Sequence, residues 1–398
     1  MRLLYVASGI AVPGAYGGST HTLEVASGLA ALGHEVHVVA QHPARQLAAL
    51  LRPQTVTLDR LQLHYIDLPK SLSLLAYSSI ARLVRRLRPD ALIERYYNLA
   101  GAGMLAAGRA GVPSLLEVNA LIVDPPAVFK RRLDDRLGRP LQRWALAQCR
   151  MAARIVTPLH TTVPPEIERA KIVELPWGAN VDLFRRERQG GDPRALRAEL
   201  GIPDDRALVV FLGSFRAWHG VRDFVGAGIK LLEAGEPVHL LLIGDGPERA
   251  AAEAQTGRWR TQFTFAGSID HQRVPQLLAL ADVGVAPFNT APHPALRAAG
   301  FFWSPLKIYE YMAMSLPVVT ADLPPLDRTI REGQEGALFR EGDVDDLAAA
   351  IRRVLHAPDR EAMGQRARER VVACYSWARH CQELDRILQA MAEQRHAS

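Results

Sequence analysis

The sequence has few cysteines and no long apolar run, and both shortages narrow the class of protein. Three cysteines occur among 398 residues, too few and too scattered for a disulfide framework or a metal-binding cluster. Because disulfides are rare in reducing compartments, this usage predicts a cytoplasmic setting. No stretch of about 18 apolar residues occurs, so no membrane-spanning helix is expected. The first residues form too short an apolar run for a signal peptide and fit a first strand instead.

What the chain does contain is typical of a globular protein with more than one domain. Hydrophobic residues make up 48% and charged residues 23% of the sequence, both ordinary values for soluble domains. A chain of 398 residues is longer than one hydrophobic core usually organises, so we expect two domains.

Positive charge is concentrated in the first half of the chain. The net charge is +6, and residues 1–185 hold 22 Lys and Arg against 14 Asp and Glu. Many of these cations fall in one expected helix, residues 129–154: Lys130, Arg131, Arg132, Arg136, Arg139, Arg143, Arg150 and Arg154. Such a surface suits an anionic membrane or a phosphorylated acceptor. The alternative is an Arg-rich composition on an ordinary solvated helix face, and no nucleic acid partner is expected.

Apolar runs of strand length alternate with amphipathic segments of helix length. Strands are expected at 3–7, 36–40, 91–93, 114–118, 154–157, 207–212, 239–243, 263–266, 282–287 and 316–320. Helices are expected at 21–32, 80–87, 129–154, 221–233, 274–281, 306–314, 346–355 and 360–374. This alternation predicts α/β domains with doubly wound parallel sheets, joined by the charged, glycine-containing segment 185–193.

One stretch, residues 300–320, combines the features of a phosphate site. A loop ends at Pro305 and a helix begins at Leu306, and the free N–H groups of such a helix start attract anions. Lys307 adds a positive charge there, and Glu310 lies about one turn further along the same face. A carboxylate at that reach suits the hydroxyl groups of a ribose. The pattern therefore predicts a pocket for a nucleoside diphosphate.

The same stretch resembles the donor-binding signature of glycosyltransferase family 4, the retaining enzymes with the GT-B fold. In one-letter code it reads SPLKIYEYMAMSLPVV. The family's second Glu falls on Glu310, where it holds the nucleotide ribose, whereas Phe302 stands where the family has its first Glu, beside the donor sugar. The resemblance implies a donor-binding role for the signature's first residues: Ser304, Pro305, Leu306 and Lys307.

Two places in the first half also resemble the family. Gly17 and Gly18 follow the first strand, at the edge where open α/β sheets bind ligands, and resemble the loop whose N–H groups approach the donor phosphate. Asn119 follows the strand 114–118, where the family often has a His that meets the donor sugar. Glu117 lies two residues earlier. Both are candidate catalytic residues, and for Glu117 the alternative is a structural pair with a nearby Arg.

The loop after strand 207–212 departs from the family in the residues that grip the diphosphate. The family has an Arg and a Lys where this chain has Ser214 and His219. We expect Arg216 and Lys307 to supply positive charge to the leaving diphosphate, with His219 donating to a phosphate oxygen. The remaining donor-site candidates lie in two turns that follow strands: Gly244, Gly267, Ser268 and Ile269.

The resemblance covers nearly the whole chain and implies two Rossmann-like domains that face each other across a cleft. The expected division is an acceptor-side domain at 1–186 and a nucleotide-sugar-binding domain at 187–374, with a terminal helix at 375–398 returning to the first. The implied location is the cytoplasm, with a peripheral contact at the inner face of the plasma membrane as a further hypothesis.

The implied reaction is transfer of a hexosyl group from a nucleotide-diphosphate sugar with retention of configuration, as in polysaccharide biosynthesis. The acceptor would be a glycan, a lipid-linked molecule or a small molecule. No Asp-x-Asp motif lies at an expected strand end, so no metal or cofactor is expected. Two alternatives stay open: a nucleotide-sugar epimerase or hydrolase, and a non-catalytic sugar-nucleotide-binding protein. Phe302, Ser214 and His219 keep the second one open.

Overall fold

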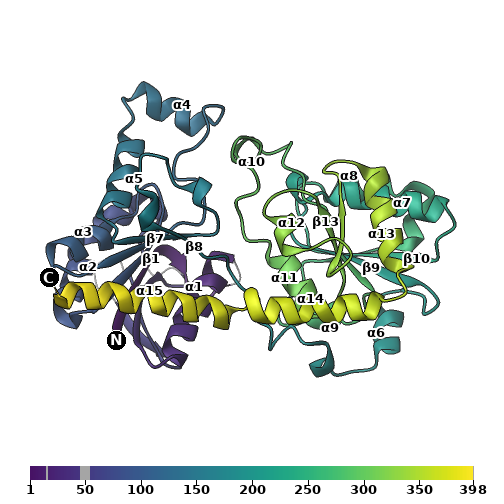
Figure 1. Ribbon diagram of the computed structural model, residues 1–398, viewed down its shortest axis with the longest axis horizontal. Helices are drawn as coiled ribbons and strands as arrows, with labels where there is room; N and C mark the ends of the chain where they lie inside the picture. Colours follow the sequence, from purple (N-terminus) through teal and green to yellow (C-terminus); the bar gives the residue numbers. More distant parts are fainter. Residues whose placement is uncertain (15–16, 45–53, 398) are drawn as a thin grey trace. The chain divides into compact units, whose positions relative to one another are not determined.

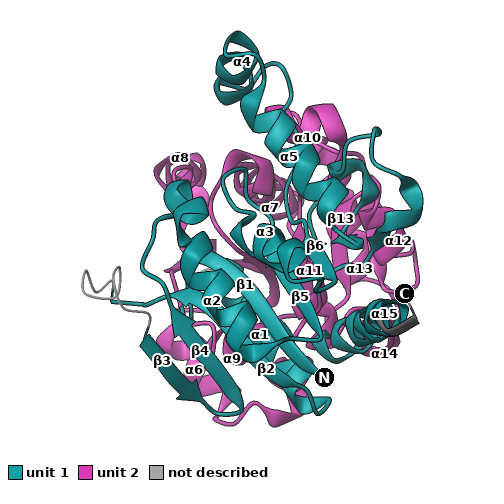
Figure 2. Cartoon of the chain, turned by 90° about the vertical axis from the view of Figure 1, so that its left-hand side faces the viewer, with its two compact units in different colours: residues 1–177, 302–304, 377–398 teal, residues 178–301, 305–376 magenta. Residues whose placement is uncertain are grey.

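The chain folds into two compact units. The computed structural model describes residues 1–14, 17–44 and 54–397. Unit 1 comprises residues 1–177, 302–304 and 377–398, and unit 2 comprises residues 178–301 and 305–376 (Figure 2). The first boundary between units falls at Trp177, earlier than the expected boundary at 186.

Unit 1 is built on an eight-stranded sheet with the order β3-β4-β2-β1-β5-β6-β7-β8. Its strands are β1 (Arg2–Ala11), β2 (Glu35–Gln41), β3 (Gln54–Leu58), β4 (Leu61–Tyr65), β5 (Ala91–Arg95), β6 (Ser114–Glu117), β7 (Arg154–Thr157) and β8 (Ile172–Glu174). All neighbours pair in parallel except β3 and β4. The central strands are buried on both faces, which explains their continuous apolar runs.

Helices cover the sheet of unit 1 (Figure 1). They are α1 (Gly17–Ala31), α2 (Tyr77–Leu87), α3 (Ala102–Arg109), α4 (Phe129–Arg136), α5 (Pro140–Met151) and α15 (Trp377–Ala397), with the 3-10 turns η2 (Lys70–Ala76), η3 (His160–Thr162) and η4 (Arg169–Lys171). Helix α15 packs along α1, where a Cβ added to Gly28 would lie 2.4 Å from the Cys381 sulfur. The absence of a side chain at Gly28 therefore permits the close approach.

Unit 2 is built on a six-stranded parallel sheet with the order β11-β10-β9-β12-β13-β14. Its strands are β9 (Ala207–Leu212), β10 (Val238–Ile243), β11 (Phe263–Gly267), β12 (Val283–Ala286), β13 (Val318–Ala321) and β14 (Gly336–Phe339). The strand order reverses direction between β9 and β12, so the carboxyl ends of these strands form the switch point where such sheets bind ligands.

The helices of unit 2 lie on both faces of this sheet (Figure 1). They are α6 (Pro193–Glu199), α7 (Val221–Glu233), α8 (Arg249–Gln255), α9 (Val274–Leu278), α10 (Pro294–Ala299), α11 (Leu306–Ala313), α12 (Leu326–Thr329), α13 (Val344–Leu355) and α14 (Arg360–Cys374), with the 3-10 turns η5 (Arg186–Arg188), η6 (Ala217–His219) and η7 (Gly257–Gln262). The α/β fold class predicted from the alternation of elements is therefore confirmed in both units.

The helix expected at 129–154 is interrupted. Helix α4 ends before Gly138 and Arg139, whose φ angles of 77° and 62° lie outside the α-helical region. The carboxylate of Asp134 then accepts backbone N–H bonds from the first turn of α5 at 2.8 and 3.1 Å. These bonds satisfy the free donors of the new helix, so the break is stabilised as a true helix start.

Two further expectations differ from the structure. Gly17 and Gly18 lie in the first turn of α1 instead of in a loop. The segment 185–193 is not a free linker, because the Arg186 guanidinium donates to the carbonyl oxygens of Ala279 and Ala281 at 2.8 and 2.6 Å. These contacts fix the segment to unit 2.

Candidate functional site

Three glycine turns lie side by side at the carboxyl ends of neighbouring strands in unit 2. Gly213 follows β9, Gly244 follows β10 and Gly267 ends β11, with φ angles of 131°, 134° and 74°. The Gly244 N–H donates to the Gly267 carbonyl oxygen at 2.8 Å. A Cβ added to Gly244 would lie 2.0 Å from the Gly213 carbonyl oxygen. Only glycine fits this spacing, and the result is a shelf of bare backbone at the ligand-binding edge.

Helix α11 begins at the same edge and is held there by Tyr311. The Tyr311 hydroxyl accepts the N–H of Leu212 at 2.6 Å and donates to the Val285 carbonyl oxygen at 3.3 Å. A Cβ added to Gly284 would lie 2.5 Å from the Tyr311 ring, so glycine is required beneath it. Pro305 precedes the helix and provides no side-chain cap, which leaves the first N–H groups without side-chain partners at the switch point.

Lys307 is buried in the first turn of α11, where none of the described residues gives its ammonium a polar partner. Its side chain is 7% exposed, and its Nζ makes no hydrogen bond to any described residue. The Nζ lies 4.4 Å from the Phe211 ring centroid and 4.9 Å from that of Phe288. Burial lowers the pKa of Lys307 to about 7, and nearby Glu310 offsets only part of this effect. An ammonium held in this way is stabilised when an anion arrives.

The glycine shelf and Lys307 meet directly. A Cβ added to Gly213 would lie 2.9 Å from the Lys307 Nζ, so the ammonium sits beside the first glycine turn. Ser214 and His219 follow in the same loop, with the Ser214 hydroxyl 3.4 Å from the His219 Nδ1. The structure therefore brings the candidates from two distant parts of the chain to one place in unit 2.

His219 is not arranged here to donate to a phosphate oxygen, as we expected it to do. Its Nδ1 lies 2.8 Å from the Ser214 carbonyl oxygen, and therefore carries the ring proton. Burial and the charge of Lys307 lower the pKa of His219 to about 3, so the ring is neutral and its other nitrogen is an acceptor. Lys307 is the buried cation of this site. Arg216 is an exposed one, and its guanidinium carbon lies 5.2 Å from the Trp218 ring centroid.

Glu310 lies one turn beyond Lys307, as the sequence predicted. Its carboxylate is 3.0 Å from the His271 Nε2, and the Glu310 side chain is 13% exposed. His271 lies in the loop that follows β11, just after Ser268 and Ile269. The carboxylate therefore faces the loop that contains the donor-site candidates Ser268 and Ile269.

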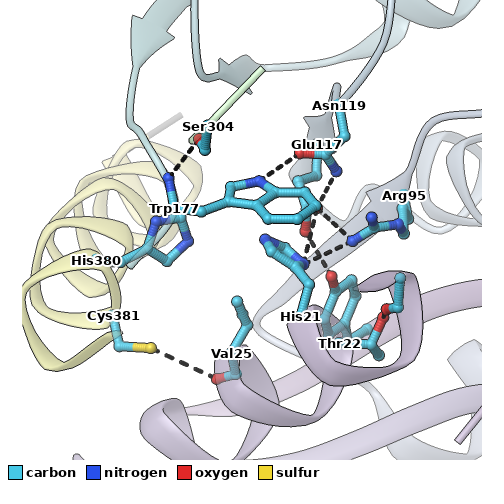
Figure 3. A network of polar contacts seen from close by, with 12 residues as sticks. His21, Thr22, Val25, Arg95, Glu117, Asn119, Trp177, Ser304, His380 and Cys381 are labelled. Carbon is cyan, nitrogen blue, oxygen red and sulfur yellow. Dashed lines mark hydrogen bonds and ion pairs between the residues drawn. The ribbon is translucent and has the colours of Figure 1, made fainter. Parts of the chain in front are cut away.

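A second polar cluster, at the carboxyl ends of β5 and β6, occupies unit 1 (Figure 3). Arg95 donates to the Glu117 carboxylate at 2.9 Å and lies 2.6 Å from the His21 Nδ1. The Tyr5 hydroxyl donates to the other oxygen of Glu117 at 2.5 Å. Glu117 is thus bound in a buried ion pair, which matches the structural alternative that we kept open for it. A role for Glu117 in positioning other groups is better supported by this geometry than direct contact with substrate.

Asn119 connects this cluster to the chain segment that precedes α11. Its side-chain nitrogen donates to Glu117, and its oxygen accepts the indole N–H of Trp177 at 2.7 Å. The backbone N–H of Trp177 donates to the Ser304 hydroxyl at 2.9 Å (Figure 3). Trp177 was not predicted from the sequence, although its place between Pro176 and Gly178 was an available signal.

Aromatic rings enclose the rest of the cluster. His21 has ring centroids 4.2 Å from Trp177, 5.2 Å from Trp377 and 5.9 Å from His380. Burial and the charge of Arg95 lower the pKa of His21 well below its usual value, so the ring is neutral. Its Nε2 has no hydrogen-bond partner among the described residues. Gly18 lies close to Arg95, since a Cβ added to Gly18 would be 3.9 Å from the Arg95 guanidinium.

Two family descriptions match this chain, one in each half. Residues 16–164 match the "Glycosyl transferase 4-like domain", and residues 206–357 match the "Glycosyl transferases group 1" family. The chain belongs to the group 1 glycosyltransferases. This membership confirms the family-4 resemblance that the signature around Lys307 and Glu310 carried.

Three curated proteins with similar sequences are named as enzymes that transfer a sugar. The alpha-D-kanosaminyltransferase of Streptomyces kanamyceticus is 27% identical over 282 residues, which span 67% of each chain. The 2-deoxystreptamine glucosyltransferase of the same organism is 28% identical over 264 residues, and the match spans 65% of that relative's length and of this chain. The D-inositol 3-phosphate glycosyltransferase 2 of Catenulispora acidiphila is 26% identical over 395 residues, spanning 91% of this chain and 87% of its own.

Solved structures show the fold. A glycosyltransferase from Rickettsia africae has a TM-score of 0.74 at 16% identity and covers 98% of both chains. The Anabaena protein HepE in complex with UDP has a TM-score of 0.72 at 18% identity, covering 98% of this chain and 100% of its own. The GT-B fold of this glycosyltransferase, predicted from the resemblance, is confirmed.

Proposed function

We propose that this glycosyltransferase transfers a hexosyl group from a nucleotide-diphosphate sugar to its acceptor with retention of configuration and without a metal ion. One observation carries the proposal: the buried, unpartnered ammonium of Lys307 beside the glycine turn at Gly213. A diphosphate placed there would receive backbone N–H bonds from the start of α11 and an ion pair from Lys307. The same cation would stabilise the negative charge on the leaving diphosphate, which is the role of a bound metal ion in other transferases.

The proposed reaction step needs no nucleophile from the protein. The bond between the anomeric carbon and the phosphate oxygen breaks, and an acceptor oxygen forms its bond to the same face of that carbon. The acceptor's proton passes to the leaving phosphate oxygen. Negative charge grows on the diphosphate during this step, so Lys307 and Arg216 would stabilise the transition state more than the bound donor.

The names of two relatives and the ligand of one structural neighbour support the choice of substrates. HepE of Anabaena was solved with UDP-glucose, at 17% identity to this chain, which supports a nucleotide-sugar donor. Two relatives have names that refer to 2-deoxystreptamine and D-inositol 3-phosphate. These names favour a small-molecule acceptor over a glycan or a lipid-linked one.

We further propose a role in polysaccharide biosynthesis, a cytoplasmic location and a peripheral contact with an anionic membrane. Among the described residues, no helix combines the length and the apolar character needed to cross a bilayer. The division of labour between a donor-binding unit 2 and an acceptor-side unit 1 is likewise a proposal, supported by the placement of Lys307 and Glu310 in unit 2.

The proposal can be tested by thermal unfolding with a panel of nucleoside diphosphates and their sugars, in buffer that contains EDTA. A ligand that binds only the native state raises its stability by mass action. We expect the nucleotides that carry one particular base to raise the unfolding midpoint of the wild-type protein. The same nucleotides should have no effect on the midpoint of Lys307→Met. If no nucleotide changes the midpoint at millimolar concentration, the proposed donor site is wrong.

A further inference from the structure

Helix α4 carries an apolar stripe on its solvent side. Phe129, Leu133 and Leu137 are spaced four residues apart, so they line one side of the helix and its end. Their exposed fractions are 73%, 46% and 66%. Figures 1 and 2 both show α4 standing away from the sheet of unit 1. The stripe is therefore not part of the core of this unit, and exposed apolar surface of this kind usually marks an interaction site.

Cations flank the stripe on both sides. Lys130 lies along one edge of the stripe, and Arg132 and Arg136 lie along the other. All three side chains are exposed. Arg132 and Arg136 make no ion pair with any described residue, and the Lys130 Nζ is 3.4 Å from Asp124. The outward face thus combines three long apolar side chains with three cationic ones.

The acidic residues of α4 point to its other side. Asp134 is buried, and its carboxylate holds the first turn of α5. Asp135 pairs with Arg131 at 3.0 Å and with Arg139 at 2.8 Å. Both carboxylates are therefore engaged, and among residues 129–137 the outward face has no negative charge.

We propose that the outward face of α4 docks on the surface of an anionic lipid bilayer. Cations attract the negative surface, and the apolar stripe then enters the boundary between headgroups and acyl chains. The long stems of Lys and Arg reach back to the phosphates while the stripe is inserted. A nucleic acid would match the cations but not the stripe, so lipid fits both features together.

Helix α2 provides an internal comparison. Arg82, Arg85 and Arg86 are exposed on it, but its apolar residues, such as Ile80 and Leu83, are buried in the core. Helix α2 therefore has the charge without the stripe. The membrane proposal does not rest on the proposed function, because lipid binding itself requires no transfer activity.

The experiment measures binding of the full chain to vesicles by flotation. Vesicles of phosphatidylcholine alone are compared with vesicles that also contain about 30% phosphatidylglycerol, an anionic lipid. The apolar variant is Phe129→Ser, Leu133→Ser, Leu137→Ser, and the charge variant is Lys130→Gln, Arg132→Gln, Arg136→Gln. The matched control is Arg82→Gln, Arg85→Gln, Arg86→Gln, which removes the same charge from α2. Thermal unfolding with a nucleoside diphosphate checks that each variant is folded.

We expect the wild-type protein to bind only the anionic vesicles, and less tightly at high salt. Each lost cation should weaken binding about fivefold, so the charge variant should lose roughly 100-fold. The apolar variant should lose about as much, and the α2 control less than about threefold, because its cations lie away from the stripe.

Two results would overturn the proposal. One is an equal loss in the α2 control and the charge variant, since binding would then follow net charge alone. The other is a lipid-free dimer that the apolar variant converts to monomer, because the stripe would then be a contact between copies. Vesicle binding without any nucleotide response would leave docking standing and count against the proposed donor site only.

Discussion

Replacing Lys307 by Met should stabilise the unliganded protein and abolish its response to nucleotide. Burial lowers the pKa of Lys307 from 10.5 to about 7, and each pKa unit corresponds to about 1.4 kcal/mol. Holding the charge in its pocket therefore costs on the order of 4–5 kcal/mol. Met loses the contacts of the ammonium with the rings of Phe211 and Phe288, worth roughly 1 kcal/mol together. A net gain of about 3–4 kcal/mol remains, or roughly 6–16 °C in the unfolding midpoint.

The pH dependence of this gain has a definite sign. Below pH 7 the Lys307 ammonium is charged in both the native and the unfolded protein, so the full cost is present. Between pH 7 and 10.5 the native state releases the proton while the unfolded state keeps it. Because the unfolded state then binds more protons, wild-type stability rises with pH over this window. The advantage of Lys307→Met should be largest at pH 6 and shrink steadily toward pH 9.5.

The assay is denaturant unfolding of both proteins between pH 6 and 9.5. Lys230→Met is the matched control, because the Lys230 ammonium is exposed and lies 2.6 Å from Asp345. Because water and salt screen an exposed pair of this kind, the control should change little or lose stability slightly. If Lys307→Met is no more stable than the wild type at pH 6, or if its advantage does not change with pH, the reasoning about a buried unpaired cation is refuted.

Three other substitutions test the remaining parts of the site. Glu310→Gln loses a charge-assisted bond to the ribose worth roughly 1.5–3 kcal/mol, so calorimetry should show donor affinity about tenfold lower; unchanged affinity would remove Glu310 from the site. Arg216→Ala should lower kcat more than donor affinity, because its charge acts mainly on the leaving diphosphate; a change in affinity alone would contradict this. Glu117→Gln breaks the buried pair with Arg95 and should cost about 3–5 kcal/mol in urea unfolding, whereas Glu174→Gln, in an exposed pair with His160, should cost less than about 1 kcal/mol. Equal costs would show that the unit 1 cluster is not structurally important.

The elements that the sequence predicted well are those with a local signal. Buried parallel strands appear as apolar runs, and the candidate phosphate site could be proposed because Lys307 and Glu310 fall on one helix face. Strand β3 was missed because its exposed, polar side chains give no apolar run. The break between α4 and α5 depends on the backbone angles at Gly138 and Arg139, and an amphipathic pattern does not reveal these.

The unpredicted parts of the site depend on contacts between distant residues. An Arg partner for Glu117 was one alternative, but the sequence did not identify Arg95, which lies on another strand. The neutral state of His219 follows from its bond to Ser214 and its place beside Lys307. Spacing in the sequence could suggest that these residues were near one another. It could not show that Lys307 lacks a partner, which is the property from which the proposed function follows.

The most direct test of the proposed function is release of nucleoside diphosphate from a panel of nucleotide sugars, in EDTA, with small cyclitols and a crude acceptor extract as acceptors. Wild-type protein should consume one donor and form a product that keeps the anomeric configuration, as followed by NMR. Lys307→Met should bind acceptor but show turnover reduced by at least about 100-fold, because the buried cation stabilises the leaving diphosphate. A wild-type protein that binds nucleotide sugar but never transfers it, or a Lys307→Met variant with unchanged turnover, would contradict the account.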